Sequence, residues 1–215
     1  MPKTMDPIRD QAAGAGYLTR QDQSYLLALA RFTLQTYLSR ERLPEVDPAE
    51  LTPGTAARAC CFVTLHKGEQ LRGCIGTIVP TTPLYLAVIE NAISAATRDG
   101  RFVPVSFREL PGLTIEISVL TPARPVHFSG QDHLLSLLVP KKHGVILSNG
   151  PYHGLYLPQM WNYFDKNQRQ KEAFLTSLSQ KAGDFGGTLW MHPDTHFEVF
   201  EAVCFKEPVR GRERF

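Results

Sequence analysis

Two β-hairpin patterns limit the folds available to this chain of 215 residues. In the first, an alternating run over residues 59–66 is followed by the turn Lys67-Gly68-Glu69 and a returning run over residues 70–78. In the second, two apolar runs within residues 144–157 flank the turn sequence Ser-Asn-Gly-Pro. Because a tight turn joins only antiparallel strands, the sequence favours mainly antiparallel sheets over a doubly wound nucleotide-binding fold.

The remaining elements are predicted from periodicity and capping signals. Residues 113–120 alternate between apolar and polar, which predicts a strand with one buried face, and residues 196–205 predict a final strand. Helices are expected to begin at Thr19, with Asp22 completing a capping box, and at Thr82, which precedes Pro83. The predicted helices cover residues 19–39, 82–100, 134–139 and 168–182. We therefore expect an α+β fold in which helices flank the sheets.

The composition excludes several classes of protein. Hydrophobic residues make up 43% of the chain and the formal net charge is +2, so we expect a globular protein for which nucleic acid is an unlikely partner. The four cysteines show no regular spacing and are expected to be free thiols in a reducing cytoplasm. No apolar run approaches the roughly 18 residues that a membrane span requires.

The segment at 71–76 is the strongest candidate for a functional site. Gly73 and Gly76 bracket Cys74 within a strand, where glycine normally weakens packing, so a ligand could approach the backbone there. Alternation predicts that Arg72, Cys74 and Gly76 share one face and that Leu71 lies on the opposite, core face. A nearby guanidinium would favour the reactive thiolate. Alternatively, Cys74 is a small buried hydrophobe, and the glycines permit a bulge or a tight helix contact.

Two further groups of residues could contribute to such a site. Arg98, Asp99 and Arg101 surround Gly100 after the second predicted helix, where they could hold an anion or simply end the helix. On the less apolar face of the 113–120 strand, Glu116 and Ser118 could provide acid–base chemistry or form a solvated strand face.

Loops at the ends of the second hairpin could complete a pocket. His143 and Gln159 occupy these positions, although both also fit ordinary turns. The seven histidines show no compact ligand pattern, so no metal site is expected. The sequence also lacks the common phosphate-binding loops and the nucleophile elbow, and it identifies no cofactor.

Taken together, these segments resemble the AMMECR domain family, named for the AMME-syndrome candidate region and found in bacteria as protein A of the AmmeMemoRadiSam system. The resemblance covers residues 18–205 and departs at Gly100, where many members have proline. The motifs that carry it are Leu-Arg-Gly-Cys-Ile-Gly at 71–76, Arg98-Asp99 with Arg101-Phe102, Glu-Ile-Ser-Val-Leu-Thr at 116–121, His143-Gly144-Val145, Leu157-Pro158-Gln159 with Trp161, and Lys181-Ala182-Gly183.

The resemblance implies an α+β fold in two unequal subdomains that share a cleft beside the hexapeptide motif. It also implies association with a Memo-like protein and a radical SAM enzyme, but it supplies no reaction. We expect a flexible leader at residues 1–17, the AMMECR domain at 18–205 and a basic tail at 206–215.

Three functions remain open from the sequence. The first is an enzyme, or a component of one, that binds a small anionic substrate: Cys74 would be the nucleophile or thiol ligand, Arg72 and Arg101 would hold the anion, and Glu116 would be the acid or base. The second is a noncatalytic module that docks a partner protein through the same surface, with Cys74 serving only in packing. The third is nucleic-acid binding through the basic tail.

Overall fold

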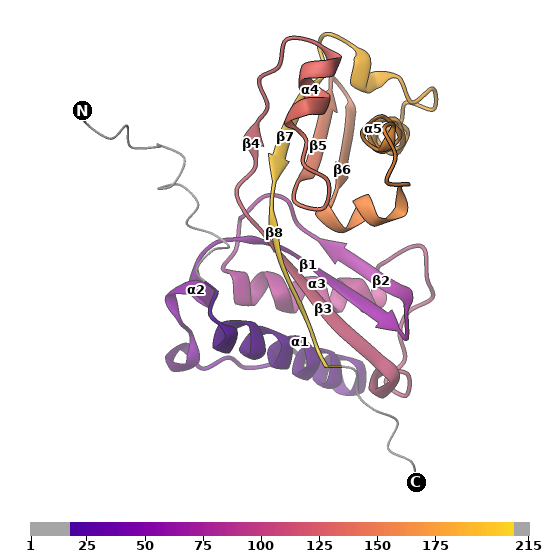
Figure 1. Ribbon diagram of the computed structural model, residues 1–215. Coiled ribbons are helices and arrows are strands. Elements are labelled where there is room, and N and C mark those ends of the chain that lie inside the picture. The colour runs from indigo at the N-terminus through magenta and orange to yellow at the C-terminus, as the bar shows by residue number, and fades with distance from the viewer. Residues whose placement is uncertain (1–17, 209–215) are drawn as a thin grey trace, which may run out of the picture. The chain divides into compact units, whose positions relative to one another are not determined.

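The computed structural model describes residues 18–208, which form two compact units (Figure 1). The described part of the first unit comprises residues 18–121 and 203–208, and the second unit is Pro122–Ala202. The predicted leader at 1–17 and residues 209–215 of the predicted basic tail lie outside the described residues. That the two parts share a cleft stays a prediction.

The first unit contains a four-stranded antiparallel sheet with helices packed against it. The strand order is β2-β1-β3-β8, and α3 packs against β1 and β2 while α1 packs against α3. Its elements are α1 (Arg20–Arg40), η1 (Pro48–Glu50), α2 (Pro53–Ala56), β1 (Cys60–Lys67), β2 (Gln70–Gly76), α3 (Leu84–Thr97), η2 (Leu110–Gly112), β3 (Leu113–Leu120) and β8 (Ala202–Lys206).

The core of the first unit follows from the alternation of β1 and β3. Val63, Leu65 and Ile115 are fully buried on the face turned toward the helices. At the start of α1 the predicted capping box is confirmed: the Asp22 N–H donates to Thr19 Oγ1 at 3.1 Å, and the Thr19 N–H donates to Asp22 Oδ2 at 2.8 Å. Such a cap stabilises a helix by about 1 kcal/mol.

A β-bulge changes the predicted faces of β2. Leu65 pairs with Gly73 but His66 pairs with Leu71, so Arg72 is an extra residue with no partner in the ladder. The extra residue reverses the alternation on its N-terminal side. The prediction that Leu71 lies in the core is therefore wrong, and its side chain is 39% exposed.

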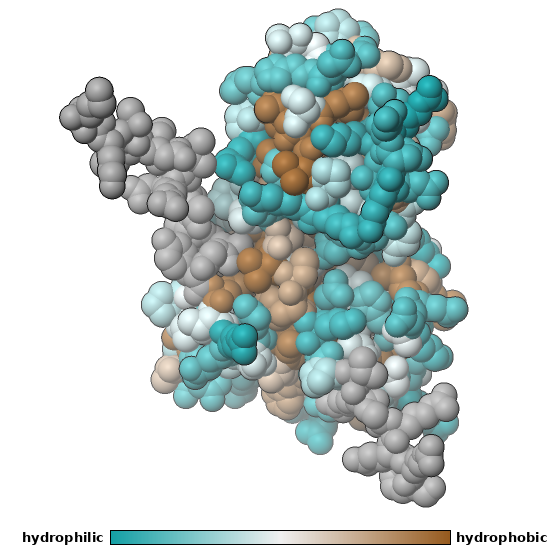
Figure 2. All heavy atoms as spheres, in the orientation of Figure 1, coloured by the Kyte–Doolittle hydropathy of each residue, from teal (hydrophilic) through white to brown (hydrophobic). Residues whose placement is uncertain are grey.

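The second unit contains another four-stranded antiparallel sheet, with strand order β4-β7-β5-β6. In the hydrophobic core of this unit, Trp161 stacks on Phe174 with ring centroids 3.6 Å apart. Its elements are β4 (Arg124–Pro125), α4 (Gln131–Leu137), β5 (Gly144–Asn149), β6 (Tyr152–Tyr156), η3 (Pro158–Tyr163), α5 (Gln170–Lys181), η4 (Leu189–Met191) and β7 (His196–Phe200). Figure 2 shows apolar residues on the visible surface of this unit around α4, where Leu137 and Val139 are exposed.

The predicted α+β class with mainly antiparallel pairing is confirmed, whereas three local predictions are corrected. The predicted strand at 196–205 is two strands, β7 and β8, which belong to different sheets and are interrupted at Glu201. Thr82 does not cap α3, because Pro83 is the N-cap residue and no side chain bonds there. The helix predicted at 134–139 begins three residues earlier, at Gln131.

Candidate functional site

Both glycines of the 71–76 segment have a packing role. Gly73 faces α3, and a Cβ at this position would collide with the carbonyl oxygen of Ala95. A Cβ at Gly76 would collide with the ring of Phe62. Gly73 therefore allows β2 to pack closely on α3, which is one of the two interpretations that the sequence left open.

The backbone of Cys74 is held by the loop that follows α3. Asp99 Oδ2 accepts a hydrogen bond from the Cys74 N–H at 2.8 Å, and Arg101 Nη2 donates to the Cys74 carbonyl oxygen at 3.3 Å. Arg101 also donates to both carboxylate oxygens of Asp99, at 2.9 and 2.6 Å. The Arg101 guanidinium, with the backbone hydrogen bonds, lowers the pKa of Asp99 to about 2.

Arg72 forms a second pair of the same kind. Its guanidinium donates to both carboxylate oxygens of Glu109, at 2.9 and 3.0 Å, and its side chain is only 13% exposed. Arg72 lowers the pKa of the Glu109 carboxyl, and Lys67 Nζ lies 3.6 Å from the same carboxylate. Glu109 thus occupies two nitrogens of an arginine that is already largely shielded from solvent, which leaves little of the guanidinium accessible to another anion.

Reactive side chains gather on the face of the first sheet that is turned away from α3, here called the polar face. Thr64 of β1 lies between Cys74 of β2 and Glu116 of β3 in the paired register. The Thr64 hydroxyl donates to Cys74 Sγ at 3.2 Å. His66 lies on the same face, with its Nε2 atom 3.5 Å from Glu116 Oε2.

Ser118 belongs to the same face, two residues beyond Glu116 along β3. It lies opposite Phe62, is 1% exposed, and its Oγ is 3.4 Å from Cys204 Sγ on β8. Burial raises the pKa of the Cys204 thiol, and the charge of Glu116 adds to this increase.

Burial favours the neutral form of the Cys74 thiol. Burial raises its pKa above the ordinary value for a thiol, although the Thr64 hydrogen bond and the charge of Arg101 act in the opposite direction. The prediction that Arg72 favours a thiolate at Cys74 is thus corrected, because Glu109 engages Arg72 and Arg101 is the guanidinium that acts on the thiol.

Residues 18–208 contain neither a cluster of metal-ligating side chains nor a helix able to span a membrane. Within this range no three histidine, cysteine or acidic side chains are grouped closely enough to hold a metal ion. Nor does any described helix combine the length and apolar character that crossing a bilayer requires.

Comparisons with known proteins identify the family. The sequence model of the AMMECR1 family matches residues 27–205, which is most of the chain. The chain belongs to the AMMECR1 family.

A protein of Methanopyrus kandleri is 35% identical over 209 residues, covering 91% of this chain and 96% of the relative. A protein of Thermococcus gammatolerans is 36% identical over 201 residues, covering 87% and 94%. The crystal structure of an uncharacterized protein from Pyrococcus horikoshii matches with a TM-score of 0.77 and 33% identity, covering 85% of this chain and 90% of that chain.

Within this AMMECR1 domain, most of the predicted site residues lie in the first unit. Cys74, Gly76, Glu116 and Ser118 share the polar face, whereas Gly73 faces α3. The paired arginines and their loop lie beside β2: Arg72 is in the bulge, Asp99 and Arg101 bind the Cys74 backbone, and Arg98 is exposed at the C-cap of α3.

The other two predicted residues belong to the second unit of the AMMECR1 domain. His143 precedes β5; its Nδ1 atom accepts a hydrogen bond from the Val139 N–H at 3.2 Å, and burial lowers its pKa. Gln159 is in η3, one residue after Pro158. Their roles stay predictions.

Sequence reasoning missed Thr64, His66 and Glu109. The alternation of β1 placed Thr64 and His66 on one face, and this was the signal available in the sequence. A regular two-residue hairpin would pair Lys67 with Gln70 and then Thr64 with Gly73. The bulge shifts the register by one and places Thr64 opposite Cys74 instead.

Proposed function

We propose that this AMMECR1-domain protein is an enzyme, or a component of one, that binds a small anionic substrate at the polar face of the first unit. The observation that carries the proposal is the arrangement of Cys74, Glu116 and His66 on three adjacent strands. His66 Nε2 is buried and, among the described residues, has no hydrogen-bond partner, although Glu116 lies 3.5 Å away. A buried polar atom left unsatisfied costs about 1–3 kcal/mol, and such sites are concentrated where function requires them.

The geometry supports distinct roles for these groups. Cys74 is the group that contacts substrate, and Glu116 is the acid or base, close enough for its charge to influence the Cys74 thiol. Because burial favours the neutral thiol, nucleophilic attack requires a proton acceptor, and Glu116 with its neighbour His66 supplies candidates.

Arg101 is better suited than Arg72 to hold the anion. Its side chain is 57% exposed although one edge is bound to Asp99, and Arg98 is exposed in the same loop. The Arg72 side chain is only 13% exposed, and its Nε and Nη2 atoms donate to Glu109. We therefore assign substrate binding to Arg101 and Arg98 and a structural role to Arg72.

A titration followed by backbone NMR tests this assignment. The full chain is titrated with inorganic phosphate and with acetate, and we expect saturable shifts of the Cys74 and Arg101 amide signals. Arg101→Gln should remove these shifts, whereas Arg124→Gln, at an exposed arginine of the second unit, should not. Absence of saturable shifts with both anions, or their persistence in Arg101→Gln, would count against anion binding here.

The family resemblance supports partners for this reaction. We propose that a Memo-like protein and a radical SAM enzyme act together with this chain. Co-purification with each partner and isothermal titration of the purified pair would test this. Absence of binding to both proteins would contradict it.

A second candidate is a noncatalytic docking module, and the packing of β2 favours it. Gly73 and Gly76 are explained by the contacts with α3 and Phe62, and both site arginines are paired internally. Leu71 is 39% exposed on this strand. Leu71→Ser should then weaken partner binding, whereas Glu116→Gln should have no effect. If the protein is instead an enzyme, Glu116→Gln should lower turnover and Leu71→Ser should not.

A further inference from the structure

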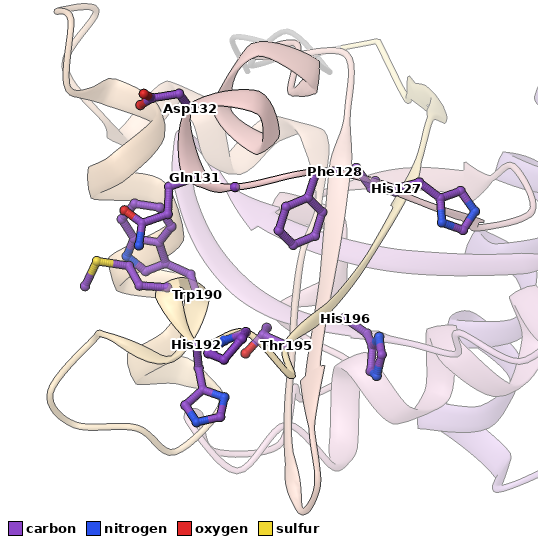
Figure 3. A pocket seen from close by; sticks show the side chains of 12 residues that line it. His127, Phe128, Gln131, Asp132, Trp190, His192, Thr195 and His196 are labelled. Carbon is purple, nitrogen blue, oxygen red and sulfur yellow. The ribbon is translucent and has the colours of Figure 1, made fainter.

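The second unit contains a cavity that the proposed function does not use. Its volume is about 730 Å³, and it lies between two segments of the chain, residues 126–132 and 190–196 (Figure 3). This is within the range of about 300–1,000 Å³ that is typical of small-molecule sites. All of its lining residues belong to the second unit, whereas Cys74 and Glu116 belong to the first.

The two walls are fixed by regular structure. The Val126 N–H donates to the Phe197 carbonyl at 2.8 Å just beyond the β4–β7 ladder, and Phe128 packs edge-on against the Phe197 ring at a centroid distance of 5.6 Å. On the other wall the Trp190 N–H donates to Ser179 Oγ at 3.1 Å, and its indole N–H donates to Thr176 Oγ1 at 3.3 Å. The cavity is therefore preformed, which lowers the entropic cost of binding.

Two imidazoles are available at its rim. Continuing the β4–β7 register by two residues places His127 opposite His196. Both side chains are exposed. The two imidazoles and the Gln131 side-chain amide form no side-chain hydrogen bond or ion pair with any residue in the 18–208 range. His192 is different, because its Nδ1 atom already accepts from the Asp194 N–H at 3.3 Å.

Figure 3 shows how these side chains divide the cavity. The Phe128 ring lies between Gln131 and Trp190 on one side and His127 and His196 on the other. The Asp132 carboxylate is directed away from Phe128. The centre is thus aromatic, and hydrogen-bonding side chains lie on both sides of it.

The lining residues narrow the chemistry of the ligand. None of them is lysine or arginine, so the cavity lacks the fixed cations that phosphate groups require. A metal ion alone is not favoured either, since no three ligating side chains are grouped anywhere in the described residues. An aromatic surface with imidazole and amide groups suits a flat, uncharged molecule with hydrogen-bonding atoms on its edge.

We propose that this cavity is a second ligand site and that it binds an uncharged, planar nitrogen heterocycle of purine size. The heterocycle packs against Phe128, and its edge bonds to the imidazoles of His127 and His196. This site is independent of the one proposed around Cys74, so the failure of either proposal leaves the other unaffected.

An NMR titration of the full chain tests the proposal. The seven histidines each give an imidazole carbon–proton signal, and the protein is titrated with adenosine, guanosine and, as a control, ribose. We expect saturable shifts of the His127 and His196 signals with at least one nucleoside, with ribose producing none. The His66 and His153 signals should not move.

Matched variants distinguish nucleoside binding in the cavity from binding elsewhere on the protein. His127→Gln and His196→Gln should each weaken nucleoside binding at least tenfold. His153→Gln should not, because His153 is also an exposed histidine of this sheet but does not line the cavity. The proposal is overturned if neither nucleoside produces a saturable shift, if ribose shifts the same signals, or if His153→Gln weakens binding equally. Tighter binding of AMP than of adenosine would also overturn it, since the cavity offers the phosphate no cation.

Discussion

The Asp99 carboxylate accepts a hydrogen bond from the backbone N–H of Cys74 at 2.8 Å. β2 is an edge strand, so this N–H would otherwise be unpaired on the open side of the sheet. Arg101 bonds to the carbonyl of the same residue, and the Asp99–Arg101 pair thereby takes the place of a neighbouring strand. The loop after α3 thus fixes the position of the candidate thiol.

Replacing Asp99 should destabilise the first unit. Asp99→Asn weakens the pairing with Arg101 and the bond to the Cys74 N–H, and we expect a loss of about 1–3 kcal/mol in the free energy of unfolding. Urea denaturation measures this loss. Asp194→Asn is the matched control, because the Asp194 side chain is 82% exposed and the change should be close to neutral. An equal effect of both substitutions would contradict the importance of the clamp.

The same carboxylate should make stability depend on pH in the acid range. The pKa of Asp99 is about 2 in the folded protein, against an ordinary value of 3.8 that applies to the unfolded chain. The ionised Asp99 carboxylate therefore stabilises the fold fully above about pH 4, and this contribution is lost as the pH falls toward 2. The linked free energy is roughly 2 kcal/mol. Unfolding measured between pH 2 and 6 should show a shallower pH dependence for Asp99→Asn than for the unmodified chain, and identical profiles would refute this.

The close approach of β2 to α3 predicts a strong effect at Gly73. Gly73→Ala places a methyl group against the Ala95 carbonyl, which is backbone and has little freedom to move. We expect a loss of at least about 1–3 kcal/mol, as in other overpacked cores. Gly100→Ala is the control, since no atom lies within 4 Å of the Cβ position there. Thermal unfolding of the two variants should differ clearly, and similar melting temperatures would show that the contact is easily relieved.

Cys74 should react slowly with alkylating reagents at neutral pH. Its pKa is raised by burial, so the alkylation rate should rise only above the pH at which a free thiol, with a pKa of about 8.5, ionises. Thr64→Val removes a hydrogen bond that lowers this pKa and should raise the apparent value further. Arg72→Gln should leave it unchanged.

Mass spectrometry of iodoacetamide-treated protein, read at Cys74, tests whether Arg72 acts on the thiol. A fall in the rate or a rise in the apparent pKa on Arg72→Gln would mean that Arg72 acts on the thiol despite its pairing with Glu109. Rapid labelling at pH 7 would contradict the buried, neutral thiol altogether.

The buried ion pair between Arg31 and Glu207 should be essential to the first unit. Arg31 also donates to the carbonyls of Leu110 and Leu113, and Glu207 accepts from the Ile115 N–H at 3.0 Å. Glu207→Leu leaves the Arg31 charge buried without its partner, which typically costs about 3–5 kcal/mol. Chemical denaturation should reveal this loss, and Glu198→Leu, in the second unit, serves as the control. A loss below 1 kcal/mol (about the value of an exposed pair) would contradict it.

The predictable parts of the fold are those with strong local signals. β3 was predicted with its exact bounds because residues 113–119 alternate without interruption, and the α1 capping box was correct because Thr19 and Asp22 are three residues apart. The glycines of the 71–76 segment allowed a bulge as one interpretation, but its position at Arg72 follows from the pairing of β1 with β2, which the local sequence does not encode.

The candidate site likewise combines residues that local signals reveal with contacts that they do not. Cys74, Glu116 and Asp99 were found from residue types and glycine spacing, but the pairing of Arg72 with Glu109 joins residues 37 positions apart and leaves no trace in either segment. The cavity of the second unit was missed for this reason as well. Its two walls, residues 126–132 and 190–196, are separated by most of that unit.

The return of the chain to its first sheet determines the order in which the protein can fold during synthesis. β8 completes a sheet whose other three strands end at Leu120, and Glu207 follows it directly. The ribosome therefore releases every residue of the second unit before the first unit has its last strand. Since domains generally fold as units while they emerge, the second unit can reach its native state before the first unit acquires β8.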